Sequence, residues 1–277
     1  MRRVLITGAA RGIGAALARR LHEHGAQVAL LGLEDELLAG VAADCGNAFW
    51  AHTDVSDREM VDENLAAAVE RLGGLDVVVA NAGIAAQLPL VGGDPAVMER
   101  TLAVNVLGAY YTLRAAGPHV SHPNGYALAV SSLGAAVHLP LMGAYSASKA
   151  AVEALGNTLR VELAPSGAKV GVAYFAQLDT DMTTRGFGTK AAEQMVKRMG
   201  PLHRVAPLSG AIDAVEKGIE RRARRIVYPR RGAAVLPTRM TAQRFIDRFA
   251  QRGLAEALEI ARGEHAPLTT EQERVQA

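Results

Sequence analysis

Short apolar runs and segments of helical periodicity alternate along most of the chain. The apolar runs predict buried strands at residues 3–7, 28–31, 49–52, 75–80, 126–130 and 169–174. Between these runs, the spacing of apolar residues predicts helices up to about residue 24, from residue 34, and at 57–72, 98–116 and 145–163. Continuous apolar strands that alternate with helices indicate a parallel sheet covered on both faces. The pattern therefore predicts a doubly wound α/β domain.

The pattern changes after residue 174. Further elements are expected there as a lid of short helices, a helix and a strand, at residues 179–207, 211–222 and 224–229. No linker rich in proline and serine interrupts the chain before them. We therefore expect a single domain over residues 1–235, followed by a helical extension and tail over residues 236–277.

The extension contains an amphipathic basic helix, predicted at residues 238–250. Its apolar face carries Ala242, Phe245, Ile246 and Phe249, with Arg244 and Arg248 opposite. Such a helix packs on its own domain, on a partner subunit or on an anionic membrane surface. We favour packing over membrane contact. About the last dozen residues are polar, and we expect them to be disordered.

Charge is distributed unevenly along the chain. The formal net charge is +2, but residues 221–252 contain ten arginines and one acidic residue, Asp247. A basic cluster of this kind is typical of contact with nucleic acid or an anionic membrane. A solvated helix face and exposed strand ends account for it equally well, and we favour that interpretation. No nucleic-acid partner is therefore expected.

Three further features bear on the location of the protein. The single cysteine, Cys45, excludes an internal disulfide framework and suits a reducing cytoplasm. Glycine follows the first arginines too soon for a secretory signal. Residues 115–148 lack charged side chains, but their three prolines argue against a membrane span. We therefore expect a cytoplasmic protein. Its eight histidines show no metal-ligand spacing, so no metal is expected.

The segment "TGAARGIG", residues 7–14, directly follows the first predicted strand and opens the first helix. Gly8, Gly12 and Gly14 allow a tight turn and a close backbone approach to a pyrophosphate, which then lies at the helix N-terminus. This strand–turn–helix context is the one that a dinucleotide-binding glycine motif requires. The segment therefore predicts a dinucleotide site.

The segment "GAYSASKA", residues 143–150, places Tyr145 four positions before Lys149. On a helix these two side chains share one face. A free tyrosine has a pKa of about 10, and a neighbouring ammonium group lowers the pKa of the phenol toward neutral pH. The small residues between them leave room for a bound molecule. The pair therefore indicates proton transfer at an oxygen atom.

These two motifs occur with others in a fixed order. "TDV" at residues 53–55, "NAG" at 81–83, Asn105 and "SS" at 131–132 accompany them. In this combination the chain resembles the short-chain dehydrogenase/reductase family, in its main single-domain branch, over about residues 3–182. The resemblance implies a Rossmann fold and an oxidoreductase that transfers a hydride between NAD(P)(H) and a small-molecule substrate.

The resemblance implies a catalytic set of Asn105, Ser132, Tyr145 and Lys149. Tyr145 would act as general acid/base, Lys149 would lower its pKa and bind the nicotinamide ribose, and Ser132 would polarise the substrate oxygen. We favour Ser132 over the adjacent Ser131 for that role. Asn105 would interrupt its helix, hold a water molecule and connect Lys149 to a proton relay.

The cofactor-binding residues that the resemblance implies are Gly8, Arg11, Gly12, Ile13, Gly14, Glu34, Asp54, Val55, Asn81, Ala82, Gly83, Tyr145, Lys149 and Thr180. Among them, Asp54 would hydrogen-bond the adenine and Val55 would line its pocket. The choice between NAD and NADP stays open. Glu34 can bind a ribose 2′-hydroxyl and would repel a 2′-phosphate, whereas Arg11 can attract one.

The substrate side departs from the family pattern. Phe175 and Ala176 stand where the family has Pro-Gly, although Thr180 and Met182 match. The candidate substrate residues are His138, Leu139, Phe175 and Met182, and the lid would add Phe187, Met195 and Met199. Their mostly apolar character indicates an apolar secondary alcohol or ketone.

Two alternatives stay open. Nucleotide-sugar epimerases and dehydratases share the Tyr-x-x-x-Lys pair, but they have a different glycine spacing and a larger substrate domain. A redox sensor that binds the cofactor without turnover typically lacks the tyrosine or the serine. The resemblance also implies a homo-oligomer, a dimer or tetramer, assembled through the helices near residues 98–116 and 145–163.

Overall fold

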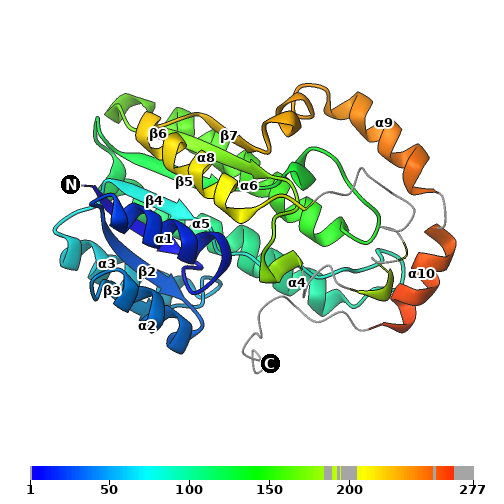
Figure 1. Cartoon of the computed structure of the whole chain (residues 1–277), viewed down its shortest axis with the longest axis horizontal. Coiled ribbons are helices and arrows are strands. Elements are labelled where there is room, and N and C mark those ends of the chain that lie inside the picture. Colours follow the sequence, from blue (N-terminus) through cyan, green and yellow to red (C-terminus); the bar gives the residue numbers. More distant parts are fainter. Residues whose placement is uncertain (1, 184–188, 192–193, 195–204, 252–253, 265–277) are drawn as a thin grey trace.

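Seven parallel strands form one sheet in the part of the chain that the structure describes (Figure 1). The structure is a computed structural model and describes residues 2–183, 189–191, 194, 205–251 and 254–264. The strands are β1 (Arg3–Thr7), β2 (Gln27–Gly32), β3 (Phe49–His52), β4 (Val77–Ala80), β5 (Tyr126–Val130), β6 (Lys169–Phe175) and β7 (Arg225–Tyr228). Their order across the sheet is β3-β2-β1-β4-β5-β6-β7. The predicted parallel sheet is confirmed.

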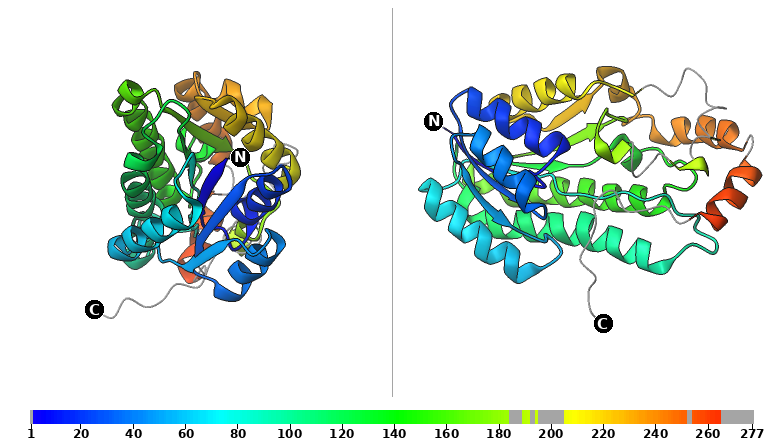
Figure 2. Two further views of the ribbon diagram at one scale, coloured as in Figure 1. Left: turned by 90° about the vertical axis from the view of Figure 1, so that its left-hand side faces the viewer. Right: turned by 60° about the horizontal axis from the view of Figure 1, so that its bottom comes forward.

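Helices cover both faces of this sheet, as the two views of Figure 2 show. One layer contains α1 (Gly12–Glu23), α2 (Asp35–Asp44) and α8 (Leu208–Arg221). The other contains α3 (Arg58–Leu72), α5 (Gly108–Val120) and α6 (Gly143–Glu162). The fold is therefore the doubly wound, Rossmann-type arrangement that the sequence predicts.

Alternate residues of each strand supply the two cores. In β1, Val4 and Ile6 pack with the layer of α1, while Leu5 packs with the layer of α3. Successive side chains of a strand point to opposite faces of the sheet, and here both faces are covered. This explains why the strands are continuous apolar runs instead of alternating with polar residues.

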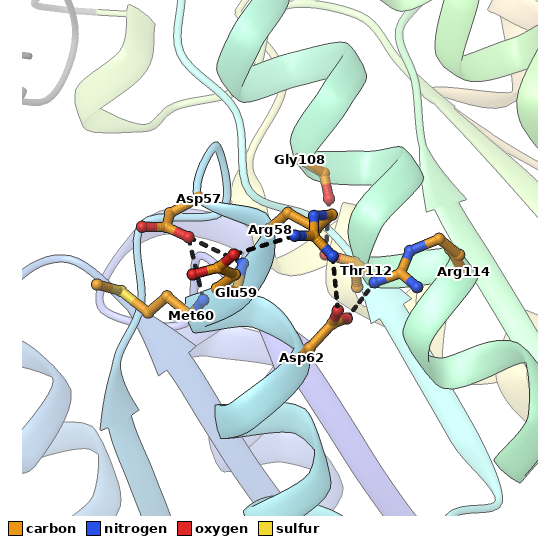
Figure 3. A network of polar contacts seen from close by, with 8 residues as sticks. All are labelled: Asp57, Arg58, Glu59, Met60, Asp62, Gly108, Thr112 and Arg114. Carbon is orange, nitrogen blue, oxygen red and sulfur yellow. Dashed lines mark hydrogen bonds and ion pairs between the residues drawn. The ribbon is translucent and has the colours of Figure 1, made fainter.

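Polar contacts position α3 beside α5 (Figure 3). Asp57 is the N-cap of α3, and its side chain accepts hydrogen bonds from the backbone N–H groups of Glu59 and Met60. One turn further, the carboxylate of Asp62 pairs with the guanidinium of Arg114 on α5. The start of α3 is thereby capped and fixed beside α5.

The helix predicted at residues 98–116 is interrupted. It consists of α4 (Pro95–Leu102), the π-helical segment η1 (Ala103–Leu107) and α5. After the π-helical turn, Gly108 packs directly on the loop after β3: a Cβ atom at Gly108 would lie 2.5 Å from Cγ2 of Val55. The π-helical segment contains Asn105 and ends directly before Gly108.

Some boundaries differ from the sequence prediction. Leu75 is buried, yet β4 begins only at Val77. Strand β6 extends one residue beyond Tyr174, since Phe175 pairs with Tyr228 of β7. Helix α10 (Leu254–Gly263) was not predicted.

The C-terminal extension contains α9 (Arg239–Ala250) and α10, and in Figures 1 and 2 both lie at the end of the molecule opposite the N-terminus. A 3-10 segment, η6 (Arg230–Ala234), joins β7 to this extension. No helix within the described ranges has the length and apolar character needed to cross a bilayer. The tail at residues 265–277, expected to be disordered, lies outside the described residues.

Candidate active site

The strand order reverses between β1 and β4, and ligands of open α/β sheets bind at the carboxyl ends of the strands at such a position. A cavity of about 540 Å³ lies there. Its cofactor end is lined by the segments that follow β1, β2 and β3. Its substrate end is lined by Val137, Leu139, Pro140, Met142, Phe175, Met182 and Ile246. The catalytic candidates lie between these two ends.

The glycine turn after β1 is built for close approach. Gly8 and Gly12 adopt positive φ angles of 64° and 55°, a conformation that residues with a side chain rarely adopt. A Cβ atom on Gly14 would lie 2.2 Å from the carbonyl oxygen of Gly8. Gly14 does not line the cavity itself, but it allows α1 to begin directly behind the turn. The resulting cradle at a helix N-terminus fits a pyrophosphate.

Asn81 and Thr7 hold this turn against β4. The side-chain amide of Asn81 donates to the carbonyl oxygens of Thr7 and Gly8, at 2.9 and 3.2 Å. In return, the hydroxyl of Thr7 accepts hydrogen bonds from the backbone N–H groups of Asn81 and Ala82. The ends of β1 and β4 are therefore linked at the point where the strand order reverses.

Arg11 and Glu34 are partners in one ion pair at the cofactor end. The guanidinium of Arg11 forms two hydrogen bonds with the carboxylate of Glu34, and its Nη1 lies 3.0 Å from Oδ2 of Asp181 in the segment after β6. Burial lowers the pKa of Arg11, but the two carboxylates outweigh this effect and raise it. The side chains of Arg11, Glu34 and Asp181 thus contribute one positive and two negative charges to this contact.

Asp54, also at the cofactor end, is held by α4. Its carboxylate lies 2.6 Å from Nη2 of Arg100 and accepts hydrogen bonds from the hydroxyl and the N–H of Ser56. Burial raises the pKa of Asp54, but Arg100 and Ser56 more than offset this and hold it below the usual range. Asp54 is therefore a fixed anion in the cavity wall.

The two serines after β5 point to different partners. The hydroxyl of Ser131 donates to the carbonyl of Lys149 at 2.7 Å. The hydroxyl of Ser132 accepts from the N–H of Gly134, donates to the carbonyl of Phe175 and forms a hydrogen bond with Tyr145. Ser132 is therefore the serine whose hydroxyl lies beside the tyrosine.

Asn105 lies behind the cavity instead of lining it. Its side chain accepts from the N–H of Ile84 at 2.8 Å and donates to the carbonyl of Ile84 and to the hydroxyl of Ser148, both at 2.9 Å. Ser148 in turn donates to the carbonyl of Tyr145. The π-helical turn at η1 thus places Asn105 between the loop after β4 and the start of α6.

Lys149 is buried beside Tyr145. Its Nζ donates to the carbonyl of Val130 at 3.0 Å and lies 5.8 Å from the centre of the Tyr145 ring. A Cβ atom at Gly83 would lie 3.2 Å from this Nζ, so a side chain at this point of the loop after β4 would crowd the ammonium group. Burial lowers the pKa of Lys149 to about 8.

The pKa of Tyr145 shifts in the opposite direction from the sequence expectation. Burial raises it above its ordinary value of 10, and the hydrogen bond with Ser132 offsets only part of this effect. A desolvated phenolate is penalised more than its neighbours stabilise it. In this structure the tyrosine is therefore a protonated hydrogen-bond donor at neutral pH.

At the substrate end, the Phe175–Ala176 segment continues the sheet. The backbone N–H of Ala176 donates to the carbonyl of Tyr228 at 3.0 Å, a hydrogen bond that joins the end of β6 to β7. Phe175 is buried and lines the cavity, as do Leu139, Thr180 and Met182. The replacement for Pro-Gly therefore provides an apolar wall without breaking the strand.

The sequence matches the family model for short chain dehydrogenases over residues 2–191, which is more than half of the chain. The protein belongs to the short-chain dehydrogenase family. As a member of this family it is an oxidoreductase whose cofactor is NAD or NADP, and the glycine cradle described above fits such a dinucleotide. The match ends at residue 191, so α9 and α10 lie beyond it.

Individual relatives agree with this assignment. The trans-4-hydroxycyclohexanecarboxylate dehydrogenase of Sinomonas cyclohexanicum is 35% identical over 199 residues, which cover 66% of this chain and 76% of the relative. A dehydrogenase/reductase from Sinorhizobium meliloti 1021 is similar in structure, with a TM-score of 0.72 and 28% identity over 82% of this chain and 92% of that chain. The 3-ketoacyl-(acyl-carrier-protein) reductase from Brucella melitensis, complexed with NADH, has a TM-score of 0.72 and 27% identity over 82% of this chain and 96% of that chain.

Not every predicted site residue of this short-chain dehydrogenase lines the cavity. Asn105 and Gly14 lie behind it, as described, and His138 is exposed outside it. The backbone of His138 is instead bonded to the side chain of Gln243 on α9. The lid candidates Phe187, Met195 and Met199 lie outside the described residues. Within the described ranges, no three His, Cys, Asp or Glu side chains lie close enough to hold a metal ion.

Four residues of the site were not predicted as such: Arg100, Ser148, Asp181 and Ile246. Arg100 and Asp181 act through ion pairs with residues far away in the sequence, so no local spacing marks them. Ile246 was assigned to the packing face of its helix, and the surface on which it packs proves to be the cavity wall. The sequence offers one signal for Arg100: its charge has no obvious partner at helical spacing.

We predict that Lys149→Met changes the pH dependence of stability. The pKa of Lys149 is about 8 in the folded chain and 10.5 ordinarily. Between these values the unfolded chain binds more protons, so the wild type gains stability as the pH rises. The free energy of unfolding of the wild type, relative to that of the variant, should increase by about 2 kcal/mol between about pH 7 and pH 9.5. Denaturant unfolding at several pH values measures this, and parallel pH dependences would contradict it.

Proposed function

We propose that this protein is an NAD(H)-dependent oxidoreductase that interconverts a neutral, apolar secondary alcohol and its ketone. One observation carries the proposal: the hydroxyls of Tyr145 and Ser132 meet in the cavity wall, beside the buried Nζ of Lys149 and between the glycine cradle and an apolar substrate end. Bound NAD(H) supplies the hydride acceptor or donor of the reaction. The chain's own groups must then handle the proton at the substrate oxygen.

Tyr145 is the group that gives or takes this proton. In the reductive direction its phenol donates the proton to the developing alkoxide, a task for which a protonated, desolvated tyrosine is suited. The hydroxyl of Ser132, next to it, binds the same oxygen. The ammonium of Lys149 stabilises the phenolate left on Tyr145, because a positive charge nearby favours the ionised form.

Asn105 has the role of a positioning residue. Its side chain satisfies the backbone of Ile84 and the hydroxyl of Ser148, which precedes Lys149 on α6. The start of α6 is therefore tied to the loop after β4, which passes along the cavity. This fixes the distance between the tyrosine–lysine pair and the cofactor end.

The composition of the substrate end supports a neutral substrate. Seven apolar residues line it (Val137, Leu139, Pro140, Met142, Phe175, Met182 and Ile246), although the cavity lining also includes the polar residues Gln87, Gln177, Thr180, Asp181 and Thr183. A carboxylate buried against the apolar side chains would lose hydration without gaining a charged partner. The Sinomonas relative is named for a cyclohexane alcohol that carries a carboxylate. For this chain we propose a similar alicyclic or aliphatic carbon frame without the charge.

The ion pair at the cofactor end supports NAD over NADP. Glu34 occupies the guanidinium of Arg11 from one side and Asp181 approaches it from another. Two carboxylates therefore engage the guanidinium of Arg11, and the carboxylate of Glu34 would repel a 2′-phosphate. The carboxylate of Glu34 can instead accept hydrogen bonds from ribose hydroxyls. The opposing sequence cues at these two positions thus combine into a single preference.

The presence of both hydroxyls and the ammonium in one wall favours turnover over sensing. A sensor that only binds the cofactor has no need for a serine and a tyrosine beside a buried lysine. An epimerase or dehydratase of nucleotide sugars requires room for a second polar nucleotide, and the substrate end described here is apolar.

We further propose that the protein is a cytoplasmic homo-oligomer. Large apolar side chains are exposed along the outer helices that the family resemblance assigns to assembly. Leu107 is 44% exposed, Tyr110 46% and Val161 74%. Burial of these side chains against a second copy would stabilise a dimer or tetramer.

We predict that Tyr145→Phe lowers kcat/KM by roughly 100-fold or more, because general acid catalysis contributes about that much. Ser132→Ala should have a comparable effect, and both variants should bind NADH like the wild type. Ser131→Ala is the matched control, since its hydroxyl bonds to the backbone of α6 and its loss should be smaller than about 100-fold. Turnover is followed by nicotinamide absorbance, and NADH binding by fluorescence.

Equal losses in Ser131→Ala and Ser132→Ala would contradict the assignment of the active serine. A Tyr145→Phe variant with undiminished turnover would contradict the proposed mechanism as a whole.

We predict that the wild type prefers NADH to NADPH by at least about tenfold in kcat/KM, which corresponds to about 1.4 kcal/mol of repulsion at the 2′-phosphate. Glu34→Gln should reduce or reverse this preference, because it releases Arg11. Asp35→Asn is the matched control: it removes a neighbouring carboxylate that pairs with His52 outside the cavity. If Glu34→Gln and Asp35→Asn changed the cofactor preference equally, overall charge and not the ion pair would determine that preference.

We predict a molar mass of two or four chains by size-exclusion chromatography with light scattering. Tyr110→Glu should lower that mass, because it places a charge on the outer surface of α5. Leu37→Glu alters an exposed side chain of α2, in the opposite helix layer, and should leave the mass unchanged. A monomeric wild type would contradict the oligomer.

A further inference from the structure

The C-terminal extension reaches the active-site cavity. The family match ends at residue 191, and among the described residues beyond it, Ile246 of α9 lines the cavity. Ile246 is half-buried and belongs to a helix whose other face is exposed to solvent. The wall that it forms therefore lies beyond the residues that the family model matches.

Gln243 fixes α9 to the loop that follows β5. The backbone N–H of His138 donates to Oε1 of Gln243 at 2.7 Å, and Nε2 of Gln243 donates to the carbonyl of His138 at 3.0 Å. Nε2 also donates to Oδ1 of Asp247, at 2.7 Å, which fixes which end of the amide faces each partner. One side chain thus satisfies both backbone groups of a loop residue.

Two further contacts position the extension. At the start of α9, the guanidinium of Arg239 pairs with Glu153 of the helix that carries Tyr145 and Lys149, with 2.9 Å between Nη2 and Oε1. After α10, the carboxylate of Glu264 accepts hydrogen bonds from the backbone N–H groups of Lys190 and Ala191. The extension is therefore attached to α6 at its start and to residues 190–191 at its end.

The attachment places Ile246 over the substrate end. Ile246 follows Gln243 by three positions, so both lie on the same side of α9. Val137 and Leu139, on either side of the residue that Gln243 binds, line the cavity. The apolar side chain of Ile246 and the apolar loop thus face the same space.

We propose that α9 is the outer wall of the substrate end, and that Ile246 limits the size of the apolar group that a substrate can carry away from its reacting carbon. The proposal rests on the function proposed above and adds its specificity determinant. Gln243 is a positioning residue in this account, because it acts by holding α9 against the loop at His138. The substrate class that follows is a compact alicyclic or short aliphatic ketone.

Two ketones of different length test this proposal: cyclohexanone and 4-tert-butylcyclohexanone, each with NADH. Ile246→Ala should raise kcat/KM for the bulky ketone relative to cyclohexanone by about tenfold, since apolar pockets discriminate by roughly 10- to 200-fold per methylene group. Ile246→Phe should change the ratio in the opposite direction. The KM for NADH should be unchanged in both, which also shows that the variants are folded.

Met240→Ala is the matched control, because Met240 lies on the same helix and is 80% exposed. It should leave the ratio for the two ketones at the wild-type value. A ratio that is the same in the wild type, Ile246→Ala and Ile246→Phe would overturn the proposal while leaving the proposed function intact. A wild type that reduces neither ketone would overturn the proposed function and this proposal with it.

Gln243→Glu separates positioning from general stability. A glutamate still accepts from the N–H of His138 but has no donor for its carbonyl, so α9 should be held less firmly. We expect a KM for cyclohexanone several-fold higher, with the KM for NADH and the kcat near wild-type values. A loss confined to kcat, or an equal change in both KM values, would contradict the positioning role.

Discussion

The structure depends on one constraint: a parallel sheet brings the carboxyl ends of all its strands to the same edge, where their backbone polar groups must find partners. Side chains provide these partners. Asn81 and Thr7 bind each other's backbone across β1 and β4, and Asn105 satisfies both backbone groups of Ile84. These contacts order the ends of the strands around the cavity, with the glycine turn on one side and the tyrosine–lysine pair on the other.

The same burial that orders this edge sets the chemistry of its ionisable groups. Desolvation moves the pKa of Lys149 down to about 8 and that of Tyr145 up, so two groups of similar ordinary pKa move apart in proton affinity. The phenol therefore holds its proton firmly, and it can release the proton only when a nearby positive charge stabilises the phenolate. A buried ammonium destabilises the folded chain at neutral pH, and this is the kind of stability that active sites commonly sacrifice for function. Asp54 at the cofactor end is desolvated too, but Arg100 and Ser56 more than offset this cost within the wall.

The sequence predicts those parts of the site that depend on local spacing. The glycine turn requires a strand before it and a helix after it, and Tyr145 and Lys149 share a helix face, so both are visible in a linear pattern. Contacts between distant segments are not visible in a linear pattern. Arg11 and Glu34 are opposing cues when considered separately, and only the fold brings them into one ion pair. Ile246 is one of several apolar residues on an amphipathic helix, and nothing in its own sequence distinguishes a cavity wall from an ordinary core. The direction of the Tyr145 pKa was missed because burial, which decides it, is a property of the fold.

The central claim is that this edge carries out hydride transfer with NADH. The most direct measurement is the nicotinamide absorbance of NADH mixed with wild-type protein and a panel of neutral cyclic and aliphatic ketones. The account predicts that the absorbance falls at a rate that depends on the ketone, as NADH is oxidised and the ketone reduced. Tight NADH binding without oxidation by any of these ketones would contradict the proposed substrate class, and failure to bind NADH at all would contradict the assignment of the cavity.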